Sequence, residues 1–500
     1  MRSPSGPEQA DGHRPPPGVV IAAAALAAGP VALAFFSGGY FDRPRVIALL
    51  GVAPVLVLLA VAAPARHLLL RGVAAPAALA GFAGLALWVA LSGGRSPVPD
   101  MAADDAERVL LYAAFLAAGS VAWRSRPAAR LAEPAVAAGI VVVIGFGLAG
   151  RWLPGVVELT ATVSAGGRLE QPLTYWNATG MLAGVGAVLC ARLAGDPDRG
   201  GALRAAAAAG AVPLLCGVYL SFSRGALAAL VAGLLVLVLC APSMRQLRAI
   251  ATTVLAGAPA VLATALLPGV RALEGTAAAR ERDGLVALAV TLAAMAAAAG
   301  ATAWWARPPA GDPLRPGRSL LPRPARWALV AAIVLTVVGP VLASRGGDDG
   351  RARPEAGFGA TTQRFANVRS NRYAYWEVAL DSFADRPLVG VGSGGWGTEW
   401  LRERPIGEAA RDAHSVELET LAELGLVGLG LLALAFGGVA GAAVVLQRRD
   451  PQVAAGASAG LTVWLAHATL DWDWELPAVT LPALTLAAVL IARAQEPVRG

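Results

Sequence analysis

Runs of about twenty apolar residues recur along this 500-residue chain, and they constrain its fold more than any other feature. A helix needs about 20 apolar residues to cross the hydrocarbon core of a bilayer. The chain is 56% hydrophobic and 15% charged, whereas soluble domains carry about a quarter charged residues. Backbone polar groups inside a bilayer must be satisfied within the segment. The sequence therefore predicts an all-α, polytopic integral membrane protein.

Counting these runs predicts about 14 transmembrane helices. The first run has no convincing cleavage site and many others follow it, so we expect a helix rather than a signal peptide. The predicted spans are 18–37, 45–63, 73–92, 106–123, 133–150, 176–195, 201–220, 225–241, 249–268, 284–305, 327–343, 420–446, 453–470 and 477–492.

The Arg residues predict how these helices are oriented. The chain has no Lys, and its 41 basic residues gather in short clusters in alternate loops. An excess of Arg is typical of cytoplasmic loops. The pattern predicts a multi-pass protein of the cytoplasmic (inner) membrane with both termini cytoplasmic, and it explains a pI near 10 without a nucleic-acid partner. Three features then fall outside: the 151–175 loop, the 221–224 turn and a long loop at 344–415.

These segments divide the chain into four parts. Residues 1–17 form a disordered cytoplasmic tail, and residues 18–343 form a bundle of about 11 helices. Residues 344–416 form one large extracytoplasmic loop, which we expect to be catalytic; ten Arg and ten Asp or Glu balance its charge up to Ser415. Residues 417–500 add about three helices and a short cytoplasmic tail.

The long loop ends in the sequence Arg-Asp-Ala-His-Ser, which contains His414. An imidazole that titrates near neutral pH could deprotonate a sugar hydroxyl, although a plain surface histidine fits the sequence equally well. Asp412 and Glu417 could in principle bind a divalent ion, but the sequence groups them with no further ligands. We therefore predict no metal and no cofactor.

Two Arg residues stand out on the predicted outer side. Arg224 lies in a tight Ser-Phe-Ser-Arg-Gly turn, where its guanidinium could project into a cavity or simply reach the lipid headgroups. Arg372 opens a predicted helix that continues through Phe383. Tyr and Trp at helical spacing predict that this helix lies along the outer membrane surface, and a plain amphipathic cap with a solvated Arg372 is the alternative.

Two further motifs have mainly structural interpretations. The Gly-rich segment 390–395 formally matches a dinucleotide fingerprint, but no βαβ unit precedes it. It could bind a phosphate through its backbone N–H groups, and a plain flexible turn is the favoured interpretation. His467 precedes Asp471-Trp472-Asp473-Trp474-Glu475, so we expect a structural pair between His467 and one of these acids.

Several of these motifs, taken in order, resemble the O-antigen ligase / O-antigen polymerase superfamily of bacterial envelope proteins. The resemblance covers roughly residues 165–480, and the ordered set is more specific than any one block. The blocks are Gln171–Ala178, Ser221–Gly225, Arg372 with Trp376, Asp385–Gly392, Ala413–Ser415 and Leu421–Leu426.

The resemblance implies a metal-independent, inverting glycosyltransferase with a polytopic helical fold of the GT-C-like kind. By motif, Arg224 and Arg372 would bind the diphosphate of an undecaprenyl-type donor, and His414 would be the catalytic base. Residues that could support them are Arg411, Arg369, Glu417, Trp376 and Tyr175. The implied partners are a polyprenyl diphosphate-linked glycan, an acceptor hydroxyl on a glycan, lipid or protein, and the lipid bilayer.

The function expected from these observations is transfer of a saccharide to an acceptor hydroxyl outside the cytoplasmic membrane, in cell-surface polysaccharide assembly. These residues do not separate a ligase from a polymerase that extends the glycan. The spans at 249–268 and 284–305 exceed what a ligase core needs, so the subfamily stays open. A transporter or flippase of lipid-linked glycan or of a small anion is the rival class, although the predicted mid-span regions carry almost no charge. A non-enzymatic assembly scaffold is a third interpretation, which no sequence feature supports.

Overall fold

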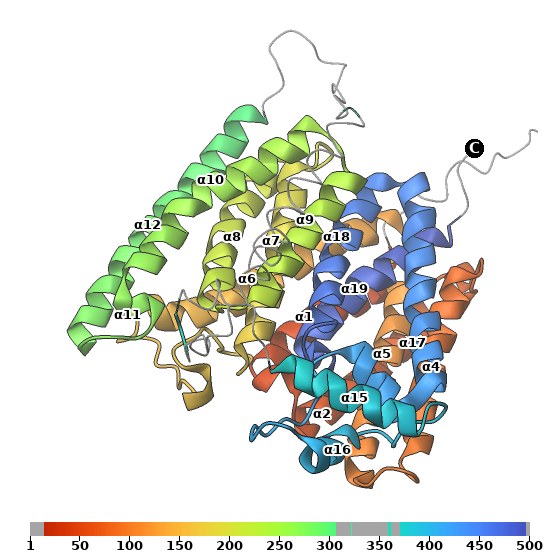
Figure 1. Cartoon of the computed structure of the whole chain (residues 1–500). Helices are drawn as coiled ribbons and strands as arrows, with labels where there is room; N and C mark the ends of the chain where they lie inside the picture. Colours follow the sequence, from red (N-terminus) through yellow and green to blue (C-terminus); the bar gives the residue numbers. More distant parts are fainter. Residues whose placement is uncertain (1–14, 307–321, 323–358, 362–370, 497–500) are drawn as a thin grey trace, which may run out of the picture.

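The computed structural model describes residues 15–306, 322, 359–361 and 371–496, and within these residues the chain is helical and has no strands (Figure 1). Three short 3₁₀ turns, η1 (Ser37–Gly39), η2 (Val163–Ala165) and η3 (Asp473–Glu475), accompany the α-helices. The α-helices are α1 (Pro17–Ala34), α2 (Asp42–Ala62), α3 (Ala65–Leu68), α4 (Ala74–Ser92), α5 (Pro99–Ala122), α6 (Arg126–Trp152), α7 (Trp176–Gly195), α8 (Gly201–Leu220), α9 (Arg224–Cys240), α10 (Met244–Leu266), α11 (Pro268–Arg271), α12 (Ala277–Trp305), α15 (Arg372–Asp385), α16 (Trp396–Glu403), α17 (Val416–Arg449), α18 (Pro451–Ala468) and α19 (Pro477–Ala494).

Ten of the described helices are long and apolar enough to cross a membrane, which confirms a multi-pass membrane protein. Each matches a predicted span. Three further predicted spans, 106–123, 225–241 and 453–470, correspond to α5, α9 and α18, which pack within the bundle but do not meet the same length and hydropathy limits. The span at 327–343 lies outside the described residues, so the count of 14 stays a prediction.

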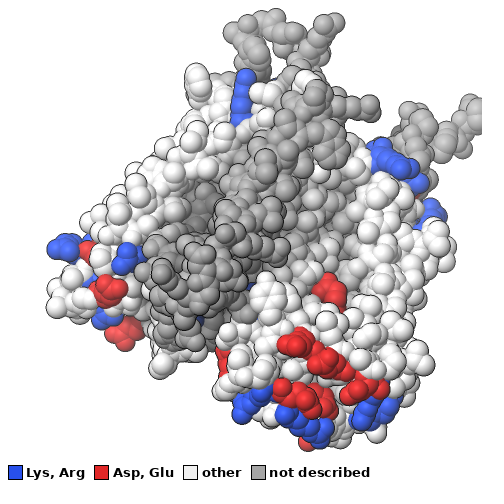
Figure 2. Space-filling view, in the orientation of Figure 1, with Lys and Arg blue, Asp and Glu red and all other residues white. Residues whose placement is uncertain are grey.

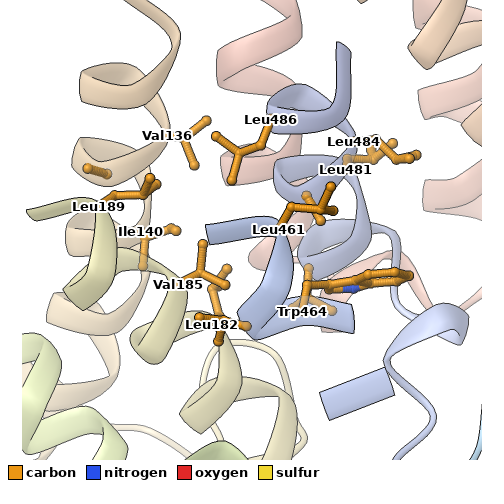
Figure 3. Close-up of a cluster of buried hydrophobic side chains, with 14 of the residues drawn as sticks. Val136, Ile140, Leu182, Val185, Leu189, Leu461, Trp464, Leu481, Leu484 and Leu486 are labelled. Carbon is orange, nitrogen blue, oxygen red and sulfur yellow. The ribbon is translucent and has the colours of Figure 1, made fainter. Parts of the chain in front are cut away.

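Helices α7 and α19 form the centre of the bundle. The most apolar 18-residue stretch of α7 is completely buried, and that of α19 is 94% buried. The corresponding stretches of α2, α10 and α12 are at most 28% buried. Leu182, Val185 and Leu189 of α7 meet side chains of α6, α18 and α19 (Figure 3). Such close packing makes the position of each helix depend on its neighbours. The turns that join the central helices are therefore held firmly at the bundle end.

Charged side chains gather at the ends of the bundle. On the face drawn in Figure 2, acidic and basic groups cluster over the end that carries α15 and α16, and a broad uncharged region lies above it. The opposite end shows Arg only on this face. This distribution fits a bilayer around the uncharged region.

Helix α17 is broken at Gly425, and the Gly-rich segment docks against the break. Gly425 has φ +65° and ψ −162°, which is not helical. A Cβ on Gly425 would lie 2.4 Å from the Leu388 carbonyl carbon, and one on Gly390 would lie 2.2 Å from that of Glu423. Four backbone hydrogen bonds join the segments: Val391 to Ala422, Gly392 to Glu423, Leu426 to Pro387 and Val427 to Leu388.

The prediction of a flexible turn at 390–395 is therefore wrong. The side-chain carboxylate of Glu423 accepts a hydrogen bond from the Trp396 N–H, and Ser393 N–H donates to Ser92 Oγ. These donors are used inside the protein. The segment fastens α15 and α16 to the end of α17.

Candidate functional site

The 151–175 loop, the 221–224 turn and residues 371–415 of the long loop lie at one end of the bundle, together with a fourth segment. The fourth is the turn Asp471-Trp472-Asp473-Trp474-Glu475 between α18 and α19. Its three carboxylates alternate with two Trp residues and are all buried. Each acid meets different basic groups: Asp471 and Glu475 meet groups from distant parts of the chain, and Asp473 meets His467 at the end of α18.

Asp471 is the centre of this site. Its Oδ2 pairs with the Arg372 guanidinium at 2.5 Å and accepts from Asn177 Nδ2 at 2.8 Å. Its Oδ1 accepts from Tyr175 Oη at 2.7 Å and lies 4.0 Å from His414 Nε2. One buried carboxylate thus brings the 151–175 loop, the start of α15 and the end of the long loop together.

The other two acids anchor the turn. Asp473 bonds Nδ1 of His467, and both side chains are fully buried, so the expected structural pair of His467 with an acid is confirmed. Glu475 pairs with Arg108 of α5, which also pairs with Asp105 at 2.8 Å. These pairs fix the turn from both sides, because a buried charge without a partner is costly.

The electrostatics favour an ionised Asp471. Burial alone would raise the pKa of the Asp471 carboxyl. The Arg372 guanidinium, the nearby His414 and His467 and the Tyr175 hydrogen bond together outweigh burial and hold the pKa below its usual range. Burial and the neighbouring Asp471 raise the pKa of the Tyr175 phenol well above its usual value. Tyr175 is therefore a neutral hydrogen-bond donor to an anionic Asp471.

His414 is held in a fixed orientation by its own turn. Its Nδ1 lies 2.9 Å from the backbone oxygen of Asp412. A carbonyl can only accept, so Nδ1 carries the proton in neutral His414 and Nε2 has the free lone pair. His414 also has φ +56°, an uncommon conformation for a residue other than Gly. Its ring lies 5.2 Å from that of Tyr375 on α15.

Arg224 opens α9 at the same end of the bundle. Ser223 caps this helix by accepting from Ala226 N–H at 3.2 Å, so the cap fixes where Arg224 begins the first turn. The next residue, Gly225, lies against His467: a Cβ there would be 3.1 Å from His467 Nε2. Through His467 and Asp473, the first turn of α9 is connected to the turn that carries Asp471.

The predicted helix at Arg372–Phe383 is present as α15, and its outward stripe is exposed at Tyr373 and Leu380. Trp376 belongs to this stripe and contacts Tyr373, with ring centroids 5.5 Å apart.

The remaining predicted supporting residues occupy different places. Tyr175 joins the Asp471 cluster. Arg411 lies over the Tyr40 ring, 5.9 Å from its centroid. Glu417 accepts from Ser415 Oγ at the start of α17. Arg369 lies outside the described residues.

A second group of acids lies beside the His414 turn. Carboxylate oxygens of Asp412, Glu419 and Glu475 all lie within 4.8 Å of one another. The expectation that nothing groups with Asp412 is therefore wrong, because the fold brings two acids to it from α17 and the 469–476 turn. Burial, with a smaller contribution from Asp412, raises the pKa of nearby Tyr40 to about 12.

The arrangement supplies the groups that an acyl, phosphoryl or glycosyl transfer to a hydroxyl needs. The unprotonated Nε2 of His414 faces the Asp471 carboxylate, and the Arg372 guanidinium binds the same carboxylate. Residues 278–433 match a family described as O-antigen ligase. The matched region contains Arg372 and His414, whereas Arg224 and Asp471 lie outside it. No curated protein matches the sequence.

Proposed function

We propose that this chain transfers a saccharide from a polyprenyl diphosphate to an acceptor hydroxyl at the outer face of the cytoplasmic membrane. The match of residues 278–433 to the O-antigen ligase family supports this proposal. The match to this family supports glycan transfer in cell-surface polysaccharide assembly. The identity of the donor, the membrane face on which the acceptor lies and the inversion at the anomeric carbon are inferences from the site.

One observation carries this proposal: Asp471 contacts both Arg372 and the face of His414 that holds the free lone pair. The guanidinium of Arg372 and the imidazole of His414 therefore lie on the same buried carboxylate. Planar guanidinium groups bind diphosphate oxygens bidentately. A lipid diphosphate can therefore lie beside Arg372 while an acceptor hydroxyl reaches His414.

The proposed chemistry is a single displacement. His414 Nε2 takes the proton of the acceptor hydroxyl as its oxygen bonds to the anomeric carbon. The bond between that carbon and the diphosphate oxygen breaks, and its electron pair leaves with the diphosphate. Attack opposite the leaving group inverts the anomeric centre. Asp471 stabilises the imidazolium that forms, since their closest atoms are 4.0 Å apart.

Arg372 and Arg224 would neutralise the charge that develops on the leaving group. Arg stays protonated at any working pH, so this stabilisation needs no metal ion. Arg224 adds the positive end of the α9 dipole, because it occupies the first turn of a 17-residue helix.

The direct test is transfer of a labelled glycan from undecaprenyl diphosphate to membrane acceptors by purified protein in lipid nanodiscs. We expect wild-type protein to release undecaprenyl diphosphate and His414→Ala to release none above background. Full transfer by His414→Ala would refute the assignment.

The same assay separates the two activities within the family. A single step in product size indicates ligation, and a ladder of products indicates polymerisation. Movement of the lipid-linked glycan across proteoliposomes without a new glycosidic bond would instead support the transporter interpretation.

A further inference from the structure

A cavity of about 80 Å³ lies beside the His414 turn, and the donor-binding groups do not line it. Its wall includes Tyr40, Arg411 and Asp412 but neither Arg372 nor Asp471. A smaller void next to it is lined by Asp471 and Trp472 and shares Glu419 and Glu475 with the cavity, so the two spaces adjoin. A cavity of this size holds several water molecules, or the polar edge of a sugar ring.

Asp412 connects this cavity to the proposed base. Its backbone oxygen orients His414 Nδ1, and its side chain lines the cavity. Trp472 provides a second connection, because its ring lies 4.3 Å from Tyr175 on the Asp471 side and 5.5 Å from Tyr40 on the cavity side. A molecule in the cavity would therefore lie next to His414.

The charge of the cavity differs from that of the Arg372 site. Seven carboxyl groups and three guanidinium groups line it. Arg108 and Arg45 are paired with some of these acids, but Asp412 has no ion-pair partner among the described residues. The Nε atoms of Arg45 and Arg108 also lack hydrogen-bond partners among these residues, although both side chains are more than nine-tenths buried.

Mixed acceptors and donors of this kind suit a polyhydroxylated ligand. Carboxylates accept from hydroxyl or ammonium groups, and guanidinium groups donate to hydroxyl oxygens. Tyr40 and Phe41 add aromatic side chains to the lining, and Trp472 packs against Tyr40 from the adjoining void. An anionic ligand is disfavoured, because its charge would face seven carboxyl groups, which either repel it when ionised or leave it poorly solvated when neutral, and only three guanidinium groups.

We propose that this cavity binds the terminal sugar of the acceptor and selects a sugar that bears hydroxyl or ammonium groups over one that bears a carboxylate or phosphate. The proposal rests on the proposed transfer function. It assigns the donor and the acceptor to two parts of the site that differ in charge. The diphosphate donor lies on the Arg372 side, the acceptor lies on the acidic side, and His414 lies between them.

The test compares three probes that share one ring and one chain: octyl glucoside, octyl glucosaminide and octyl glucuronide. Their binding to the full-length protein in nanodiscs, without donor, is measured by saturation-transfer NMR and by titration. We expect the glucosaminide to bind most tightly and the glucuronide at least about tenfold more weakly. Equal or tighter binding of the glucuronide, or no binding of the glucosaminide, would overturn the proposal.

Two matched variants test whether the cavity causes the preference among the sugar probes. Glu419→Gln removes one ionisable carboxyl group from the cavity but keeps an oxygen that can accept from Ala413 N–H, as Glu419 does at 2.8 Å. It should reduce the preference for glucosaminide over glucuronide several-fold. Glu399→Gln makes the same change on α16, where Glu399 pairs with Arg402 and does not line the cavity; it should leave the preference unchanged. An equal effect of both variants would place the selection outside the cavity.

Arg372→Ala separates this inference from the proposed function. It should abolish transfer and leave the order of probe binding intact. If wild-type protein transfers no glycan but binds the probes in the expected order, the proposed function fails and the sugar-binding cavity stands. If transfer occurs and Arg372→Ala changes the probe order as much as Glu419→Gln does, the cavity is not the selecting element.

Discussion

The carboxylate of Asp471 lies 4.0 Å from Nε2 of His414, although helices α17 and α18 separate the two residues in the chain. The same carboxylate holds Arg372. An acid that contacts both the proposed base and the proposed leaving-group cation keeps them at a fixed separation before substrate arrives. Preorganisation of this kind lowers the cost of reaching the transition state.

His414→Asn and His414→Ala should both lower transfer by about 10²–10⁴-fold, because each removes the base. They should differ in stability. Asn tolerates the left-handed conformation that φ +56° requires, whereas Ala does not. Transfer rates and thermal unfolding of the two variants in nanodiscs check this expectation. Retained activity in either variant would contradict the role of His414, and equal Tm values would contradict the backbone argument.

Asp471→Asn should destabilise the protein by roughly 3 kcal/mol, the lower end for breaking a buried ion pair, since Arg372 keeps some contact with solvent. It should also slow transfer, because His414 and Arg372 lose their common anchor. Asp381→Asn on the exposed side of α15 is the matched control and should change neither property. Chemical unfolding and the transfer assay give the two readouts.

Arg372→Lys should lower turnover by about 10²-fold or more while the positive charge is kept. A lysine ammonium cannot form the two parallel hydrogen bonds that a guanidinium offers to a diphosphate. Steady-state kinetics with varied lipid-linked donor measures the effect. Arg386→Lys, at an exposed position after α15, provides the control and should leave the kinetics unchanged. Wild-type turnover in Arg372→Lys would show that charge alone suffices.

Gly425→Ala should destabilise the protein clearly. A Cβ there would lie 2.4 Å from the Leu388 carbonyl carbon, and φ +65° disfavours any side chain. Gly430→Ala lies in the same helix with no heavy atom within 4 Å of the new Cβ. This control should be neutral or stabilising by up to about 1 kcal/mol. Similar Tm shifts for the two variants would show that docking of the 387–392 segment does not depend on Gly425.

Asp412 and Asp471 should affect stability in opposite directions as the pH changes. Burial raises the pKa of Asp412, so its stabilising neutral form is lost as the pH rises through that raised value. At Asp471, Arg372 and the neighbouring His and Tyr groups together outweigh burial and lower the pKa. The contribution of Asp471 to stability is therefore full above the ordinary Asp value of about 3.9 and is lost as the pH falls through the lowered value.

The measurement is the Tm difference between each Asn variant and wild type from pH 3 to pH 8. Asp412→Asn should gain relative stability as the pH rises, and Asp471→Asn should lose it. Parallel curves for the two variants would contradict the assigned directions.

The bundle was predictable because each span is a local property of the sequence. Twenty apolar residues define a helix without knowledge of its neighbours. Helix α5 begins earlier than the apolar run suggests, because its first turns carry Asp104, Asp105 and Arg108 and pack into the acidic cavity. Apolarity alone does not detect a polar helix end that is buried by tertiary contacts.

The site was only partly predictable, for a similar reason. His414, Arg372 and Tyr175 were candidates from their motifs, and they do converge. Asp471 was considered only as a partner for His467, because alternate acids in one turn do not reveal which base each will meet. The Gly-rich segment was misinterpreted because its partner, the break in α17, is visible only in three dimensions.

The three carboxylates of the Asp471–Glu475 turn also have a consequence for biogenesis. Arg108, Arg372 and His414 are all synthesised before this turn, so each enters the membrane surface without the acid that it meets in the finished protein. Insertion of the final hairpin, α18 and α19, supplies all three acids together. A nascent chain that stops short of this hairpin has His414 and Arg372 but lacks the carboxylate that joins them. The order of synthesis thus delays assembly of the site until the last two helices are in the membrane.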